Sequence, residues 1–517
     1  MKPAQRDGIQ RLGLIERAKR GIIGSIRWAR DAGGGGAALE RKKTMFQYLH
    51  DALVKQITSG QLAYGEQLPP LRTLCGLYNV GIRTVRDVIK ALAGEGYVTT
   101  VPGSHVRVGY RARGEGASLA QAELSRGDAL YGLMKTMEYV MPHIYAGAAG
   151  ACGSALLEAC RRDVAGIDGM DTKDQWRRAR IAFQRIVAVY GNGLLDDLYI
   201  DIDLFAQVVI VPGFDNPYGE MSVGAEAGLN RLFDRLAAGD GDGAGAIIRG
   251  MYHDAAQSVS AYHDALRAAY PAAEQAPYRW DAAKGRSRTY MEVTRDIIRR
   301  ICAGEFPDGS ELPGSARLCA EYRISPYTAF HAMEALERIQ LVEKGEGRRS
   351  YVITCARASA KVMFADGPTP VADAVTFLNA VHILSLISAG AAELGYDYLT
   401  EEDVAALSAH IGARERMRLS DGILMALIRA QPYQPLKAIG AELLSLAEWG
   451  CYFVFALQRE QALFLTVQQK CAQALQAWRA GDRAAFAGAV RDIYGFAYTA
   501  IRELLCRAGI PAAGETG

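Results

Sequence analysis

Two segments of this 517-residue chain repeat each other at one fixed distance. The matched pairs, each 244 residues apart, are Gly60 with Gly304, Leu68-Pro69 with Leu312-Pro313, Leu74-Cys75 with Leu318-Cys319, Thr84 with Thr328, and Val98 with Val342. A constant offset means that the two segments share one fold without insertions. A weaker echo follows each segment, at 146–149 with 389–392 and in the Ala-Gly-Asp sequences at 238–240 and 480–482. We therefore expect one small domain followed by one helical domain, used twice.

The composition is typical of a mainly helical globular protein with several domains. Half of the residues are apolar and 22% are charged, and runs of strand-forming residues are few and short. Nine cysteines are scattered without a Cys-x-x-Cys pair, which predicts reduced thiols and a cytoplasmic location. The apolar runs around 204–211 and 451–457 are too short to span a membrane, so we expect no membrane partner.

The first repeat has the pattern of a winged helix-turn-helix. Apolar residues at helical spacing predict a helix over Phe46–Ile57, and Leu68-Pro69-Pro70 opens a second helix. A turn at 79–81 leads to a third helix over Ile82–Ala93. Two short extended runs follow, 97–101 and 106–109, joined by a Pro-Gly turn. Three helices and a β-hairpin in this order make a winged helix.

The third helix carries basic residues on the side opposite its apolar stripe. Arg83, Arg86 and Lys90 lie one to two turns apart, so they can reach a base edge and neighbouring phosphates together. The wing adds His105 and Arg107. The front of the chain is also basic, with nine Lys/Arg against four Asp/Glu over 41–110. Charge alone fits a solvated basic face at least as well, but the order of elements favours a DNA-binding helix.

Residues 44–110 resemble the DNA-binding domain of the GntR family of bacterial repressors. The matching residues are Leu53, Ile57, Gly60, Leu62, Gly65, Leu68-Pro69, Arg72, Leu74, Thr84-Val85-Arg86, Leu92, Glu95-Gly96 and Pro102-Gly103. The resemblance implies that the arginines at the Arg72 and Arg86 positions and the wing contact DNA. The family's usual Ser-Arg before the recognition helix is Gly81-Ile82 here, which leaves the operator sequence open. The expected contacts of this copy are Arg72, Arg83, Thr84, Arg86, Lys90, His105 and Arg107.

The second copy, 288–354, resembles the same family but departs more. Ala316 replaces Arg72 and Phe330 replaces Arg86, while the wing at 344–349 stays basic. Either this copy reads a different half-site, with aromatic side chains on thymine methyls, or it has lost specific binding and serves as a dimer-like brace. If it binds DNA, the expected contacts are Tyr327, Thr328, His331, Lys344, Arg348 and Arg349.

The regions after each winged helix are expected to be all-α effector domains. They resemble, more faintly, the ligand-binding domain of the fatty-acid-regulator branch of the family, through Phe183, the segment 190–195 and the closing helices led by Ala-Gly-Asp. The resulting domains are an N-terminal arm and hinge at 1–43, winged helices at 44–110 and 288–354, helical domains at 120–270 and 366–510, and a linker at 271–287.

Many members of that branch hold a metal through one Asp and three His, and this set is absent here. In the first half Arg180 and Gln184 occupy two of these places and only His253 remains. In the second half Asp421 remains beside Met425, Cys471 and Ile493. One imidazole or one carboxylate does not hold a divalent ion, so no metal and no cofactor are expected. The candidate ligand-binding residues are Arg180, Gln184, His253 and Asp421.

Two alternatives accompany these ligand residues. Arg180 and Gln184, one helical turn apart, could receive an anionic ligand, or Arg180 could pair with a buried carboxylate. The repeated Tyr-His-Asp triplets at 252–254 and 262–264 lie nearly on one helix face and are interpreted as surface and rim residues.

The combined features predict a sequence-specific, ligand-responsive transcription regulator that binds double-stranded DNA. Two unequal fused copies should give a covalent pseudo-dimer on an asymmetric operator, with homodimers of the fused chain as a further possibility. Motifs for enzymatic catalysis are absent from the sequence, so no enzyme activity is expected. A tandem winged-helix replication initiator and a non-enzymatic interaction scaffold are the alternatives.

Overall fold

The computed structural model describes most of the chain. The described residues are 44–58, 62, 64–78, 80–100, 105–110, 116–282, 289–302, 305–338, 341–345, 349–353, 368–412, 422–448, 461–507 and 509–510. The N-terminal arm, the tip of the first wing, Arg348 and Asp421 lie outside these residues. The chain divides into two compact units, one containing residues 41–286 and the other most of residues 287–517.

The first unit begins with the winged helix that the sequence predicts. Its elements are α2 (Met45–Thr58), α3 (Leu71–Tyr78), α4 (Ile82–Gly94), β1 (Val98–Thr99) and β2 (Arg107–Val108). The two strands are antiparallel, with Val98 opposite Val108. A compact core of buried apolar side chains from all these elements, including Leu49, Leu53 and Val88, holds the domain together. The predicted bounds of the first and third helices are correct to within one residue, and the second helix begins at Leu71, directly after the Leu68-Pro69-Pro70 sequence.

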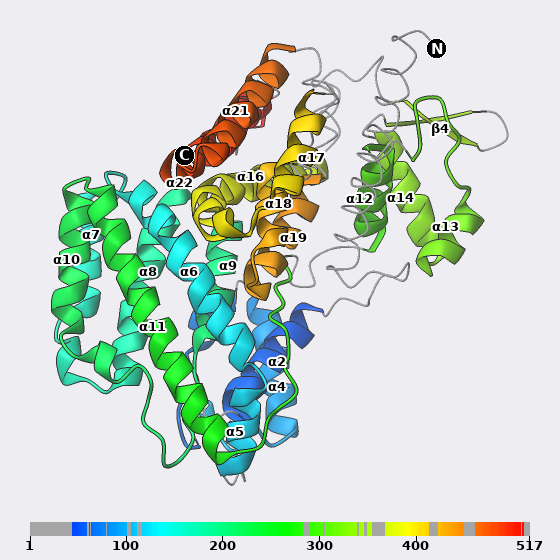
Figure 1. Cartoon of the computed structure of the whole chain (residues 1–517). Coiled ribbons are helices and arrows are strands. Elements are labelled where there is room, and N and C mark those ends of the chain that lie inside the picture. Colours follow the sequence, from blue (N-terminus) through cyan, green and yellow to red (C-terminus); the bar gives the residue numbers. More distant parts are fainter. Residues whose placement is uncertain are drawn as a thin grey trace. The chain divides into compact units, whose positions relative to one another are not determined.

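A bundle of helices completes the first unit. Its elements are α5 (Gly116–Leu124), α6 (Gly127–Ala148), α7 (Ser154–Val164), α8 (Thr172–Val187), α9 (Gly193–Ala206), α10 (Ala225–Ala237) and α11 (Gly241–Ala269), with short 3-10 turns at 167–169, 188–190 and 220–222. The long helices α6 and α11 pack along each other and form the centre of the bundle (Figure 1). The region is all-helical, as predicted.

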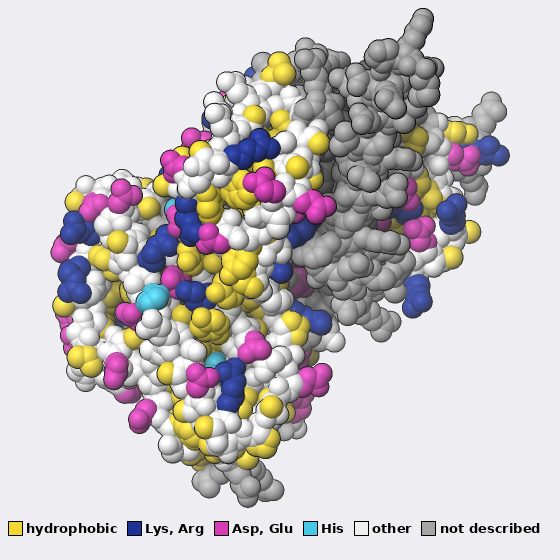
Figure 2. All heavy atoms as spheres, in the orientation of Figure 1, with side chains coloured by type: hydrophobic (Ala, Val, Ile, Leu, Met, Phe, Trp, Pro, Cys, Tyr) yellow, Lys and Arg dark blue, Asp and Glu magenta, His cyan; other side chains and the backbone are white. Residues whose placement is uncertain are grey.

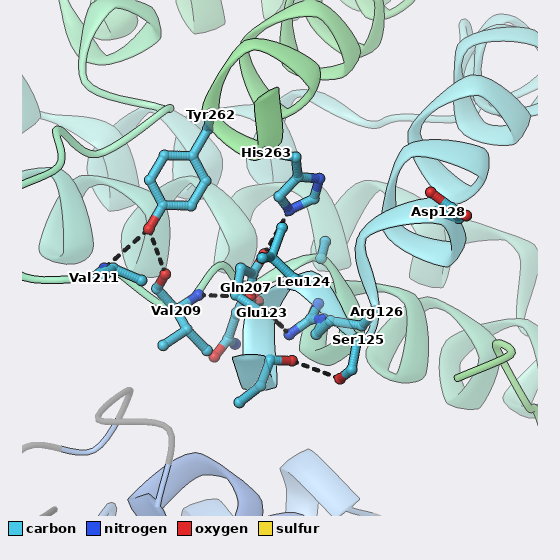
Figure 3. A network of polar contacts seen from close by, with 12 residues as sticks. Glu123, Leu124, Ser125, Arg126, Asp128, Gln207, Val209, Val211, Tyr262 and His263 are labelled. Carbon is cyan, nitrogen blue, oxygen red and sulfur yellow. Dashed lines mark hydrogen bonds and ion pairs between the residues drawn. The ribbon is translucent and has the colours of Figure 1, made fainter. Parts of the chain in front are cut away.

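A buried polar network fastens α5 to the rest of this bundle (Figure 3). The Glu123 carboxylate, 0% exposed, lies 3.0 Å from His263 Nε2 and accepts a hydrogen bond from the Val209 amide. Arg126 donates to the Gln207 carbonyl, and Tyr262 donates to the Val209 carbonyl. The Glu123 carboxylate and the Tyr262 hydroxyl thus have partners inside the protein, which is the condition under which burial of such groups is tolerated.

The interpretation of the second Tyr-His-Asp triplet as a rim is therefore wrong for two of its residues. Tyr262 and His263 are 6% and 1% exposed, because α11 is covered on this side by α5 and by residues 207–211. Helical spacing showed that the two triplets lie on one face of α11. It did not show that other segments of the chain cover this face around Tyr262 and His263.

The second unit starts with a winged helix whose elements recur at the offset seen in the sequence. They are α12 (Thr289–Cys302), α13 (Ser315–Tyr322), α14 (Pro326–Arg338), β3 (Val342–Lys344) and β4 (Ser350–Val352). All three helices begin and end 244 residues after their counterparts, and Val342 pairs with Val352 as Val98 pairs with Val108. An isolated bridge from the preceding loop to the second strand also recurs, at Gln67–Arg107 and at Glu311–Tyr351.

The second helical region contains six described helices. They are α16 (Pro368–Gly395), α17 (Glu401–Gly412), α18 (Ile423–Ala430), α19 (Gln434–Glu448), α21 (Gln461–Arg479) and α22 (Arg483–Arg507), with a 3-10 turn at 396–398. Helices α16 and α22 pack along each other, as α6 and α11 do. By length and composition the stretch Ala374–Tyr398 could cross a membrane, but 72% of its most apolar window is buried in the protein, as in a core helix.

The closing helix of each half begins in the same way. Gly239 and Gly481 have φ values of +68° and +76°, a left-handed conformation that favours glycine. The following aspartates, Asp240 and Asp482, each accept a hydrogen bond from the backbone amide three residues ahead, at 2.9 Å. The Ala-Gly-Asp sequences are thus a turn followed by a helix N-cap.

Candidate nucleic-acid interface

Helix α4 of the first winged helix has its apolar and its basic residues on opposite sides. Val85, Val88, Ile89 and Leu92 are buried, and α4 packs on α2 through this stripe. The helix therefore turns its opposite side to solvent, and Arg83, Arg86 and Lys90 are exposed there. Thr84 is half-buried, between the stripe and the exposed side. Packing of the core thus fixes which side chains are presented.

The cations on this side are not neutralised by the protein. Arg83, Arg86 and Lys90, together with Arg72 at the start of α3, make no ion pair or hydrogen bond with another described residue, although Asp87 is exposed among them. Guanidinium groups that are exposed and unpaired are free to donate to phosphates or to guanine O6 and N7. By contrast, basic and acidic side chains are interspersed on the visible surface over α7, α10 and α11 (Figure 2).

The wing contributes less to this surface than the sequence predicts. His105 is exposed, and Arg107 is exposed as well, but its Nη1 donates to the Gly65 carbonyl at 3.0 Å. Gly65 has a φ of +80° and lies in the loop that bridges to β2. Arg107 therefore fixes the loop before α3 to the wing. Sequence reasoning missed this role because the contact joins residues 42 positions apart.

The second winged helix presents a different surface at the same positions. Tyr327 and Phe330 on α14 are 74% and 58% exposed. His331 lies 3.0 Å from the Glu334 carboxylate, which also pairs with Arg338 at 3.4 Å. This face combines exposed aromatic rings with a carboxylate that would repel phosphates.

The remaining expected contacts of the second copy are engaged within the domain. Thr328 is half-buried, and its amide hydrogen-bonds to Ser325 Oγ at the start of α14. Lys344 pairs with Glu337 at 2.5 Å, and Arg349 lies 3.7 Å from Glu311. These exposed ion pairs are weak and can exchange partners. Lys344 and Arg349 of the wing can therefore still bind the phosphates of a nucleic acid.

The candidate ligand residues of the first half separate into two groups. Arg180 Nη1 lies 3.0 Å from Asp203 Oδ2, so Arg180 pairs with a buried carboxylate, the second of the two alternatives. Burial raises the pKa of the Asp203 carboxyl, and the Arg180 charge opposes that rise. His253 points elsewhere: it is exposed and contacts Glu138 at 3.2 Å and Gln257 at 2.8 Å. Among the residues that the structure describes, no three metal-ligating side chains gather.

Two cavities meet at the Arg180–Asp203 pair. A small one, about 60 Å³, lies inside the bundle among Met137, Phe183 and Tyr252. A larger one, about 710 Å³, lies between the winged helix and the bundle of the first unit and also includes Gln184. The His253 side chain lines neither cavity.

Contacts between α2 and α9 join the winged helix to the bundle, and sequence reasoning did not find them. The Tyr48 hydroxyl donates to the Asp201 carboxylate, and Lys55 Nζ lies 5.2 Å from the centre of the Phe205 ring. Burial and the neighbouring Asp201 charge raise the pKa of Tyr48, which stays a protonated donor. No local sequence signal marks a contact between residues 153 positions apart.

Residues 47–108 match the model of a family described as bacterial regulatory proteins, gntR family. No curated protein matches the chain. Similar solved structures include a GntR protein of Streptococcus agalactiae, at 15% identity over 41% of this chain and 99% of that one, with a TM-score of 0.22. Lar of Listeria monocytogenes, which controls expression of the agr system, has 18% identity over 43% and 99% with a TM-score of 0.24. Escherichia coli McbR/YncC has 17% identity over 43% and 99%, with a TM-score of 0.19. At such TM-scores these likenesses carry no argument about how the chain's parts are arranged.

Proposed function

We propose that the chain is a ligand-responsive transcription regulator whose first winged helix dominates DNA recognition. The match of residues 47–108 to the gntR family model supports this proposal. Helix α4 enters the major groove with Arg83, Arg86 and Lys90 facing the DNA, and Arg72 approaches the backbone beside it. The observation that carries this proposal is the unpaired, exposed state of these four cations, three of which lie on a helix whose other side is fixed in the core.

The two fused copies act as a covalent pseudo-dimer on an asymmetric operator. Palindromic operators reflect twofold protein symmetry, which requires equal reading surfaces. Here the second reading helix carries Tyr327, Phe330 and Glu334 in place of cations. The second winged helix therefore adds affinity through its wing and contributes less base recognition than the first.

The protein acts in the bacterial cytoplasm without an enzymatic reaction. Its helical regions respond to a small molecule and change the affinity of the winged helices for the operator. Reduced thiols support this location: Cys152, Cys160 and Cys471 are free and buried.

Selection of genomic DNA fragments by the purified full chain tests this proposal. We expect one strong half-site without a palindromic mate, bound by one chain per site as measured by light scattering. A palindromic motif of equal half-sites would overturn the pseudo-dimer, and two chains per site would favour a dimer of fused chains. Absence of any enriched motif would favour an interaction scaffold.

A further inference from the structure

The larger cavity of the first unit is formed jointly by the DNA-binding domain and the helical bundle. The winged helix supplies residues of α2, of the loop before α3 and of α3 itself, among them Gln56, Pro69 and Thr73. The bundle supplies residues of α8 and α9 and of the segment that follows α9. A volume of about 710 Å³ is within the range of pockets that hold small organic molecules.

The cavity exposes apolar side chains that a ligand would cover. Ile181 and Ile210 line it and are 38% and 42% exposed. The Trp176 indole, also in the lining, stacks on the Tyr218 ring at a centroid distance of 5.0 Å and an interplanar angle of 12°. Large apolar groups left in contact with water favour the binding of an apolar or aromatic body.

Arg180 supplies a fixed polar group in this lining. Its Nη1 is bound to Asp203, but its Nε is buried and has no hydrogen-bond partner among the described residues. A buried donor without a partner is costly and is normally satisfied by a protein group, water or ligand. The Nε edge of a guanidinium can bind two oxygens of a carboxylate or sulfonate side by side. Gln184, one turn further along α8, also lines the cavity.

We propose that this cavity is the effector site and that it binds an amphipathic organic anion. The apolar body lies against Ile181, Ile210 and Trp176, and the anionic group accepts hydrogen bonds from the Nε edge of Arg180. The proposal rests on the regulator function proposed above, and it assigns the site and the chemical class of the ligand.

The position of the cavity explains how occupancy reaches the DNA-binding face. Thr73 and Leu74 of α3 line the cavity, while Arg72 beside them is exposed towards solvent. On the bundle side, α9 carries Asp203 and also Asp201, the partner of Tyr48 on α2. A ligand between α3 and α9 therefore contacts both α3 and the helix that holds α2 through Tyr48, and it changes the presentation of Arg72 and of α4.

Calorimetric titration of the full-length chain with anilinonaphthalene sulfonate, an aromatic anion, tests the site. Uncharged phenylnaphthylamine, of similar shape, is the matched probe. We expect Ile181→Trp, which fills the cavity, to weaken both probes about tenfold or more, and Val223→Trp, 83% exposed outside the lining, to leave both unchanged. The double variant Arg180→Gln/Asp203→Asn removes both charges and should weaken only the sulfonate, by about tenfold.

The outcomes separate the site from the regulator function. Equal effects of Ile181→Trp and Val223→Trp on probe binding would overturn the site, even if the chain binds DNA. An equal loss of affinity for both probes in the double variant would overturn the preference for anions. Sulfonate binding that depends on Ile181 and Arg180, in a chain that selects no DNA, would keep the site and overturn the regulator. When both hold, saturating sulfonate should change the affinity of the wild-type chain for DNA at least about threefold and leave Ile181→Trp unaffected.

Discussion

The two winged helices of this chain have the same backbone plan and carry different side chains on the exposed sides of α4 and α14. Their three helices have the same lengths and the same bounds at an offset of 244 residues. Four positions that are cationic in the first copy are not cationic in the second: Arg72, Arg83, Arg86 and Lys90 are replaced by Ala316, Tyr327, Phe330 and Glu334. The inner positions stay apolar and buried, as at Leu53 and Ile297 or at Leu92 and Leu336.

The comparison teaches that the buried core of this fold and the exposed side of its third helix can differ independently between the two copies. Side chains inside the domain are constrained by packing, whereas a change on the solvent side of α4 or α14 leaves the core intact. The second copy has also gained internal polar contacts. Arg300 pairs with Glu305 and Glu321 and donates a hydrogen bond to the Tyr322 hydroxyl oxygen at 3.0 Å. At the equivalent positions of the first copy, the Tyr78 hydroxyl donates to Gln56. Its fold is maintained although the exposed side of α14 carries other side chains than that of α4.

Removing the cations of the first reading helix should have the largest effect. We expect Arg83→Ala/Arg86→Ala/Lys90→Ala to weaken binding to the selected operator by about a hundredfold or more, because each contact contributes roughly 1–3 kcal/mol. Fluorescence anisotropy at physiological salt measures this. The matched control is Tyr327→Ala/Phe330→Ala/Glu334→Ala, which should change affinity less than about threefold. An equal loss of operator affinity in both variants would contradict the proposed functional difference between the two copies.

Transplanting the cations into the second copy should have an intermediate effect. Tyr327→Arg/Phe330→Arg/Glu334→Lys gives α14 the outward side chains of α4 on a backbone of the same length. We expect affinity for DNA to rise about tenfold and its salt dependence to steepen, because more phosphates are neutralised. Titrations at several salt concentrations measure the slope. An unchanged slope would mean that the second helix does not approach DNA.

The two helical regions also differ in the titratable groups that they bury, which leads to a prediction about stability and pH. The His382→Phe substitution used to test it should leave the affinity for DNA unchanged. The first region buries the charged pair Arg180–Asp203, whereas the second buries His382, stacked on Tyr498 at 4.2 Å. Burial, with a smaller contribution from Arg502, lowers the pKa of His382 from 6.5 to about 4. The folded state therefore holds a neutral imidazole, and its stability should fall as the pH drops from about 6.5 towards 4, where the unfolded chain binds the proton first.

The imidazole resonances of His382, assigned with the His382→Phe variant, measure this pKa by nuclear magnetic resonance. Titration near 6.5 in the folded chain would show that the side chain is hydrated rather than buried. The same variant should retain wild-type affinity for DNA, because the residue lies in the helical region and not on a reading helix.

Local patterns in the sequence were enough to predict the elements and the exposed basic residues. Apolar spacing placed α4 and its inner stripe, and therefore placed Arg86 outside. The constant offset predicted a second domain of the same plan, and the two short extended runs after Gly96, joined by a Pro-Gly turn, predicted the wing. These features depend on neighbours within a few turns, which a sequence displays directly.

Contacts between distant segments could not be predicted in this way. The Arg107–Gly65 bond, the Tyr48–Asp201 contact and the burial of His263 against Glu123 join residues 42 to 153 positions apart. Each depends on which surfaces of two elements meet, and periodicity leaves that undetermined. The cavity around Arg180 is missed for the same reason, since its lining comes from both the winged helix and the bundle.

The affinity of Arg86→Ala and of Phe330→Ala for the selected operator, measured side by side by anisotropy at physiological salt, tests the central claim most directly. If the first winged helix reads the DNA, Arg86→Ala should weaken binding by about 1–3 kcal/mol and relax specificity at one base position, while Phe330→Ala stays within about 0.5 kcal/mol of wild type. A wild-type affinity in Arg86→Ala together with a large loss in Phe330→Ala would contradict the account.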